Sequence, residues 1–262
     1  MTLKTNLHTH TRRCRHAADQ DDRAWVEAAI RAGIEVLGFS DHCPWPRNAP
    51  PSPPPGFRSG VRMDPEEIPD YFGSLLALRE EYKDRIRILI GFEVEHLPRR
   101  IAGQDALFAP WPVDYLICGQ HFLGDGSDEW NGNWVGAPSD DESRLADYVD
   151  RCLEAMESGR YLYLAHPDVI DYTGPTPVYE RHMSRLCGWL AAHDSPVEVN
   201  LLGISGHRHY PRENFLRLAA DCGCKAVLGV DAHDPARLLD SAPEAEARAM
   251  CARAGLPVVE PL

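Results

Sequence analysis

Histidines stand at the ends of short apolar stretches along this chain. Seven of its twelve histidines follow such a stretch directly or within a few residues, namely His8, His10, His16, His42, His121, His166 and His233. Acidic side chains hold similar positions, namely Asp41, Glu93, Glu95, Asp168, Glu198 and Asp231. Imidazole with some carboxylate suits Zn, Fe and Mn, whereas Ca and Mg prefer ligand shells of oxygen alone. The pattern therefore predicts a site for transition-metal ions.

The spacing within two motifs supports the same chemistry. His8 and His10 are two residues apart on an extended segment, so their side chains point to the same side and can bind a single ion. Asp231 and His233 have the same spacing and bind either one ion or two different ions. A four-coordinate zinc takes three or four protein ligands, so this set suffices for more than one ion. Clustered ions suit phosphoester hydrolysis, because one lowers the pKa of a water while others hold the phosphoryl oxygens.

Two other kinds of protein are disfavoured. No serine stands on a Gly-x-Ser-x-Gly turn, so a Ser-His-Asp hydrolase is a poor match. The net charge of −13 argues against a protein that holds nucleic acid by neutralising phosphates. Since that charge also repels a phosphorylated substrate, bound metal ions would have to supply the local attraction.

The elements that must position these residues alternate regularly. Apolar runs predict seven strands at 3–7, 36–39, 86–92, 113–118, 161–165, 197–201 and 226–230, and a last short one at 258–259. Helical periodicity predicts helices at 22–32, 65–83, 141–158, 178–193, 211–220 and 242–254. Alternating strands and helices imply a parallel sheet, and the carboxyl ends of its strands share one face. Either a closed barrel or an open doubly wound sheet fits this pattern.

Length and composition fit one domain over residues 1–262, since 44% hydrophobic residues supply one large core. The longest apolar stretches are strand-sized, and the N-terminus lacks the apolar region of a secretory signal. We therefore expect a cytoplasmic protein without a membrane segment. The eight cysteines show no C-x-x-C spacing, which favours reduced, buried thiols.

Two long segments interrupt the alternation. Residues 44–60 hold seven prolines, which exclude regular structure, and residues 124–140 mix Gly, Asp and Asn with Trp130 and Trp134. Long loops in compact domains are usually functional or disordered. We expect a lid that covers the substrate, with a mobile surface loop as the alternative.

The ordered motifs resemble those of the PHP (polymerase and histidinol phosphatase) superfamily. They are Leu7-His8-Thr9-His10, Phe39-Ser40-Asp41-His42, Gly91-Phe92-Glu93, Gly119-Gln120-His121-Phe122, Ala165-His166-Pro167 and Gly229-Val230-Asp231-Ala232-His233. Further matches, at Arg62-Met63, Tyr71 to Tyr82 and Asp114-Tyr115, make the chain similar to the monofunctional histidinol-phosphate phosphatases. The resemblance covers essentially the whole chain. It implies a distorted seven-stranded (β/α) TIM-like barrel, not an open sheet, with three divalent metal ions (Zn, Fe or Mn).

The resemblance also implies roles for individual residues. The first ion would be bound by His8, His10, Glu93 and Asp231, the second by Glu93, His121 and His166, and the third by His16, His42 and His233. Asp41, Asp231 and His233 would be candidates for protonating the leaving alkoxide. After residue 201 the chain departs from the Gly-Leu-Arg-like segment usual in the family. Arg208, beside His207, would hold the phosphate there through bidentate contact, with a solvated basic turn as the alternative.

The expected function is metal-dependent hydrolysis of L-histidinol phosphate to L-histidinol and phosphate, in histidine biosynthesis. One alternative is a PHP-type phosphatase for another small phosphomonoester or a nucleotide. The other is a non-catalytic metal-binding regulatory module, which predicts gaps in the ligand set. Asp125, Asp128 and Glu129 are candidate contacts for the cationic amine of histidinol phosphate, or else ordinary surface acids. No nucleic-acid or membrane partner is expected, and the sequence leaves the oligomeric state open.

Overall fold

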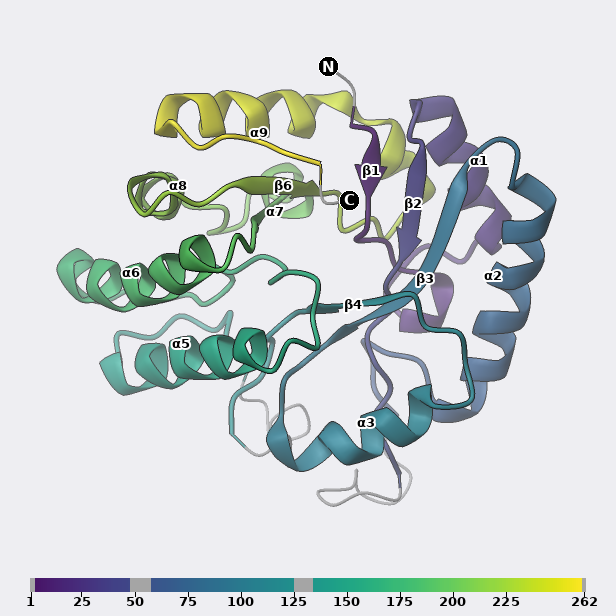
Figure 1. The fold of residues 1–262 in the computed structure, drawn as a ribbon, viewed down its shortest axis with the longest axis horizontal. Coiled ribbons are helices and arrows are strands. Elements are labelled where there is room, and N and C mark those ends of the chain that lie inside the picture. The colour runs from purple at the N-terminus through teal and green to yellow at the C-terminus, as the bar shows by residue number, and fades with distance from the viewer. Residues whose placement is uncertain (1–2, 48–57, 125–133, 261–262) are drawn as a thin grey trace.

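The computed structural model describes residues 3–47, 58–124 and 134–260 (Figure 1). Four strands form a parallel sheet in chain order: β1 (Thr5–Asn6), β2 (Val36–Phe39), β3 (Arg87–Val94) and β4 (Tyr115–Cys118). A second parallel pair joins β5 (Val197–Asn200) and β6 (Ala226–Gly229). All residues of β3 after Arg87 are buried, which suits the apolar runs that parallel strands require. The expected parallel α/β fold is confirmed.

Helices cover the strands on two flanks. In Figure 1, α1 (Asp22–Ala32) and α2 (Ile68–Tyr82) lie on one side, and α5 (Glu142–Glu157), α6 (Thr176–Ala192), α8 (Glu213–Asp221) and α9 (Ser241–Ala254) on the other. The bounds of α1 agree with the prediction because both ends are marked in the sequence. Asp21 caps the first turn by accepting from the backbone N–H of Ala24, and Gly33 ends the helix at a φ of 79°.

Two helices were not predicted from the sequence. The first, α3 (Ile101–Phe108), is continuous with a short 3-10 helix at Pro98–Arg100 and carries a glycine inside it, so its pattern is weak. The second, α7 (Leu201–Ser205), begins where the expected strand 197–201 was to end. The side chain of Asn200 accepts from the backbone N–H of Gly203 at 2.9 Å and thereby starts this helix.

The predicted strand at 161–165 is reduced to a single bridging residue. Leu164 pairs in parallel with Cys118 at the end of β4 and with Val197 at the start of β5. Likewise, Val258 makes one bridge, to Ala226. The described residues therefore contain six strands, and the count of seven is not confirmed. The four-stranded sheet is a curled half-barrel, and Leu164 links it to the β5–β6 pair.

A further bridge brings the two ends of this curled arrangement together. Thr9, after β1, pairs in parallel with Ala232, after β6. The backbone N–H of His10 donates to the carbonyl of Ala232 at 2.9 Å, and the N–H of Ala232 donates to the carbonyl of His8 at 3.2 Å. These bonds place the motif 8–10 directly beside the motif 231–233.

The eight cysteines are all unpaired, and all but Cys222 are buried, as expected. Within the described ranges, no helix has the length and apolar character needed to cross a membrane. Residues 48–57 and 125–133 of the two expected loops, including Asp125, Asp128, Glu129 and Trp130, lie outside the described residues.

Candidate metal centre

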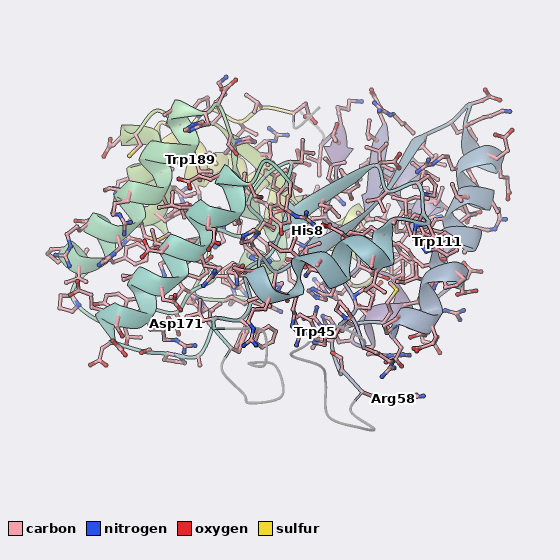
Figure 2. All side chains as sticks on the ribbon, turned by 60° about the horizontal axis from the view of Figure 1, so that its bottom comes forward. His8, Trp45, Arg58, Trp111, Asp171 and Trp189 are labelled. Carbon is pink, nitrogen blue, oxygen red and sulfur yellow. The ribbon has the colours of Figure 1, made fainter. Side chains whose placement is uncertain are left out.

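The seven histidines singled out from the sequence lie together at the strand ends. Their rings form a continuous chain of neighbours, with centroid distances of 4.3 Å for His16–His233, 4.2 Å for His233–His10, 4.4 Å for His10–His42, 5.1 Å for His42–His121, 5.0 Å for His121–His166 and 5.6 Å for His166–His8. His8 lies deep in the molecule, between the two helical flanks (Figure 2). The strand-end pattern therefore corresponds to one cluster in space.

The first predicted ligand set is compact. Nε2 of His8 lies 3.5 Å from Oε2 of Glu93 and 3.5 Å from Oδ1 of Asp231. Nε2 of His10 lies 3.6 Å and 3.2 Å from the same two oxygens. Two imidazole nitrogens and two carboxylate oxygens thus face a common point, as the ligands of one ion would.

The second and third sets are also brought together. Oε1 of Glu93 lies 2.8 Å from Nε2 of His166 and 3.3 Å from Nε2 of His121. The two oxygens of Glu93 therefore face different groups of imidazoles, as a carboxylate shared by two ions would. His16, His42 and His233 each place a ligand atom within 4.8 Å of the others. All nine predicted metal-ligand side chains consequently belong to one cluster.

The donor atoms of this cluster fit metal ions. Several are buried and lack a hydrogen-bond partner among the described residues: Nε2 of His8, both ring nitrogens of His10, Oε2 of Glu93, Nδ1 of His166, Oδ1 of Asp231 and Nε2 of His233. A buried polar group without a partner costs about 1–3 kcal/mol. Because so many such atoms converge on one place, cations that accept their lone pairs are the simplest way to satisfy them.

The protonation states of four histidines favour the same use. Burial lowers the pKa of His233 to about 4, and desolvation of the ring beside His233 lowers the pKa of His16, although much of that residue is exposed. Burial likewise lowers the pKa of His10, and that of His42 well below its usual value. Imidazoles with such pKa values are neutral at pH 7 and present the lone pair that a metal ligand needs.

Four groups of the cluster carry charge when no cation is bound, namely Glu93, Asp231, His8 and His121. Burial opposes ionisation of Glu93 and Asp231, but the surrounding histidines hold the pKa of both carboxyls well below the usual range. Burial also opposes protonation of His121, yet Glu93 and Glu95 raise its pKa to about 10. Burial also opposes protonation of His8, but Glu198, Asp231 and Glu93 raise its pKa. Metal binding would therefore displace protons from these two rings.

Two of the predicted ligands lie on strained backbone. His166 has a φ of 30° and Asp231 a φ of 52°, in the left-handed region that residues with a side chain seldom adopt. Such residues cost about 1–3 kcal/mol each and collect at functional sites. The strain supports a functional role for the ends of both segments.

Glu198, on β5, contacts two of the predicted ligand residues. Its Oε1 lies 2.8 Å from Nδ1 of His8, and its Oε2 accepts from the backbone N–H of His166 at 2.9 Å. Asn200 donates to Glu198 and to Asp231, at 3.1 Å each. Glu198 thereby orients two predicted ligands from different segments, a role that its position in the sequence did not reveal.

A cavity of about 460 Å³ opens onto the cluster. Seven predicted ligands line it: His16, His42, Glu93, His121, His166, Asp231 and His233. Its other walls are Val61, Arg62, Phe122, Trp134, Val169, Leu202, Arg208 and Tyr210. The donor cluster is thus accessible to a small molecule with an apolar part and an anionic part.

The residues expected to bind phosphate or to donate a proton differ in whether they line the cavity. Arg208 lines the cavity and donates to the hydroxyl of Tyr210 at 2.7 Å. His207 is exposed and is not among the described residues that line the cavity. Asp41 is fully buried, receives hydrogen bonds from Thr11 at 2.5 Å and is likewise not among those lining residues. Of the three candidate proton donors, only Asp231 and His233 reach the cavity.

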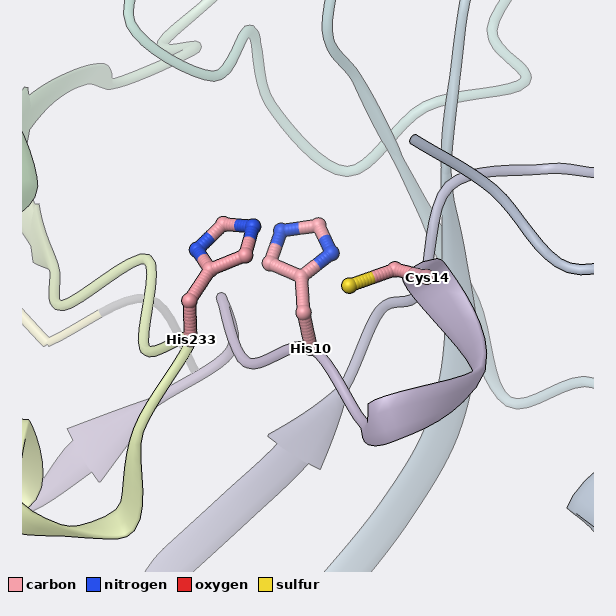
Figure 3. Close-up of side chains that lie close together, drawn as sticks. All are labelled: His10, Cys14 and His233. Carbon is pink, nitrogen blue, oxygen red and sulfur yellow. The ribbon is translucent and has the colours of Figure 1, made fainter. Parts of the chain in front are cut away.

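Cys14 was missed as a potential ligand. Figure 3 shows its sulfur directed toward the ring of His10, with His233 on the other side of that ring, and the three can share an ion. Burial raises the pKa of the thiol, so the sulfur is protonated and a weaker ligand than its imidazole neighbours. His96 lies outside the cluster; it is only 2% exposed, and its Nδ1 faces the hydroxyl of Tyr161 at 3.2 Å.

Fold and site together define a class of protein. It is an α/β protein with a curled parallel sheet whose strand ends carry a buried cluster of histidines and carboxylates, fit for metal ions and open to a cavity. The model of the PHP domain family matches residues 6–201, and the chain belongs to this family.

Individual relatives extend the likeness over most of the chain. A protein of Deinococcus radiodurans named "Probable histidinol-phosphatase" is 28% identical over 245 residues, which cover 90% of this chain and 88% of the relative. A protein of the same name from Schizosaccharomyces pombe is 24% identical over 255 residues, covering 89% and 81%. The crystal structure of histidinol phosphate phosphatase from Lactococcus lactis, complexed with zinc, L-histidinol and phosphate, has a TM-score of 0.71 at 21% identity and covers 98% and 95% of the two chains. The last likeness establishes the fold.

Proposed function

We propose that this protein is a metal-dependent phosphomonoester hydrolase that converts L-histidinol phosphate and water to L-histidinol and phosphate, a step of histidine biosynthesis. The observation that carries the proposal is the cluster of unpartnered buried donor atoms that meets a cavity of about 460 Å³. The relatives named for this activity support the choice of substrate. A non-catalytic module is disfavoured, because no predicted ligand position is missing from the cluster.

The proposed cofactors are three divalent ions, Zn, Fe or Mn, held in the three ligand sets described above. Zinc is the ion in the Lactococcus lactis structure. When bound, such ions would lower the pKa of a water and neutralise the phosphoryl oxygens. We also propose that residues 1–262 form one cytoplasmic domain. We further propose that the six strands form a distorted seven-stranded barrel in which the segment 161–165 takes the place of the seventh strand. The bridges at Leu164 and at Thr9–Ala232 support the barrel, and the unpaired cysteines support the compartment.

The chain's own residues would bind and orient the substrate. The guanidinium of Arg208 suits the phosphate oxygens, and Tyr210 holds it at the cavity wall. Phe122, Val169 and Leu202 offer apolar surface to the organic part of the substrate and exclude water from it. Asp231 or His233 would protonate the leaving alkoxide, since both reach the cavity.

The decisive test is phosphate release from L-histidinol phosphate by the purified, metal-replete protein. We expect robust release, and a fall of about 100-fold in His121→Ala, which removes one ligand of one ion. Other small phosphomonoesters and nucleotides are assayed in parallel. No release from protein shown to contain metal would overturn the assignment of L-histidinol phosphate, and faster release from another ester would replace it.

A second prediction concerns the phosphate subsite. Arg208→Ala should raise KM about tenfold or more, because a hydrogen bond to a charged group contributes about 1.5–3 kcal/mol. The metal content should not change, because Arg208 lies outside the predicted ligand sets. Arg208→Lys keeps the charge but lacks the two-pronged guanidinium, so its KM should lie between those of the wild type and of Arg208→Ala. Steady-state kinetics with metal analysis checks both; an unchanged KM in Arg208→Ala would remove the residue from the subsite.

A further inference from the structure

Glu95 follows β3 two residues after Glu93 and is not a predicted ligand, yet it contacts one. It is 1% exposed. Its Oε1 lies 3.0 Å from Nδ1 of His121, while Nε2 of the same ring lies 3.3 Å from Oε1 of Glu93. The imidazole of His121 is therefore held between two carboxylates, one on each ring nitrogen.

Arg62 fixes the carboxylate of Glu95. Nη1 and Nη2 of Arg62 donate to the two oxygens of Glu95 at 3.1 Å and 2.8 Å, a bidentate ion pair. Nη1 also donates to the carbonyl of Cys43 at 2.6 Å. The guanidinium carbon lies over the ring of Trp45, labelled in Figure 2, at 3.9 Å from the ring centroid. Because Arg62 is itself only 2% exposed, these contacts hold both charges in one geometry.

We propose that Glu95, held by Arg62, is a positioning residue for the metal centre. It accepts the Nδ1–H of His121 and so fixes the tautomer in which the lone pair of Nε2 faces Glu93 and the ion. The inference rests on the proposed function, because it requires metal to bind in the cluster. Carboxylates that accept from the far nitrogen of a ligand imidazole fix its orientation and raise its basicity.

The ion pair with Glu95 also indicates the role of Arg62 at the cavity wall. Arg62 lines the cavity, and an arginine there would ordinarily be a candidate for phosphate binding. Its bidentate pair with Glu95 and its bond to Cys43 commit the guanidinium instead to the protein. Arg208 is then the arginine available to the phosphate, and Arg62 acts on the reaction through His121.

The first experiment measures metal binding by the holoenzyme and its variants through competition with a chelator, with zinc and with cobalt. Glu95→Gln should weaken the binding of one ion about 10–100-fold and change the visible spectrum of the cobalt form. Glu66→Gln, at an exposed ion pair with Arg47, is the matched control and should change neither. Unchanged affinity and spectrum in Glu95→Gln would overturn the proposal.

Two further measurements cover the case in which a single buried charge prevents folding. Arg62→Met/Glu95→Leu removes both charges together, which proteins commonly tolerate. It should show the same weakened binding of one ion, whereas full affinity would reduce Glu95 to a structural role. In the wild-type holoenzyme, nitrogen-15 NMR should find the proton of His121 on Nδ1, and a proton on Nε2 would contradict the inference. Absence of metal binding by the wild type would instead reject the proposed metal centre itself.

Discussion

Glu93→Gln should reduce kcat/KM for phosphate release about 1000-fold and should lower the metal content of the purified protein. Glu93 is the one predicted ligand whose two oxygens face different imidazoles. Oε1 lies 2.8 Å from Nε2 of His166, and Oε2 lies 2.9 Å from Nδ1 of His42. Glutamine has almost the same shape but no negative charge and only one acceptor oxygen. The substitution would weaken the binding of two ions at once. The loss of kcat/KM should therefore exceed the 10–100-fold that is typical of a residue that merely supports a ligand.

The measurement combines metal analysis with steady-state kinetics on L-histidinol phosphate. Glu80→Gln, at an exposed position on α2, is a suitable control because it makes the same chemical change far from the cluster. A Glu93→Gln protein that kept its full metal content and more than about a tenth of its activity would contradict the shared-ligand role, since loss of that charge should cost far more.

The positions of the candidate ligands could be predicted because they follow from local patterns. Each apolar run buries a strand, and parallel strands place their carboxyl ends on one face, so a polar residue that follows such a run must lie at that face. His8, His121 and His166 come from three different segments and were expected together for this reason. The bridge between Thr9 and Ala232 then brings the motif 231–233 beside the first.

The residues that support the ligands could not be predicted in the same way. Glu198 meets His8 across 190 positions of the chain, and Arg62 meets Glu95 across 33, so neither contact leaves a periodic trace. Glu95 and Glu93 look equivalent in the sequence, and only the bidentate contact of Arg62 separates a carboxylate paired with arginine from one that faces the cluster.

The fold was likewise predictable where local signals mark an element, and not where pairing between distant segments decides it. Helices with clear caps, such as α1, were correctly bounded. The segment 161–165 has the composition of a strand, but its pairing with β5 rests on Leu164 alone. Composition reports how well a residue fits a sheet, whereas the number of paired residues depends on the geometry of the neighbouring strands. A barrel interrupted at one position and an open sheet therefore look alike in the sequence.

Gly119→Ala should lower kcat/KM about 300-fold, although it adds a single methyl group. A Cβ at Gly119 would lie 1.9 Å from Oε1 and 2.5 Å from Cδ of Glu93. The carboxylate would have to move. Because Oε1 is the oxygen that faces His121 and His166, that oxygen would lose its present position beside their ion. The effect should be smaller than that of Glu93→Gln, because the charge stays, and larger than that of His121→Ala, because the moved group serves two ions.

Gly73→Ala supplies the matched comparison. Gly73 lies on α2, and a Cβ there meets nothing within 4 Å. Alanine at an open helical position should stabilise the protein by about 0.5–1 kcal/mol and leave metal content and kinetics unchanged. Thermal unfolding of the metal-free proteins separates the two effects, since Gly119→Ala should lose activity and metal out of proportion to stability. Full activity in Gly119→Ala would mean that Glu93 does not need its present position, and the assignment of Glu93 as the shared ligand would fail with it.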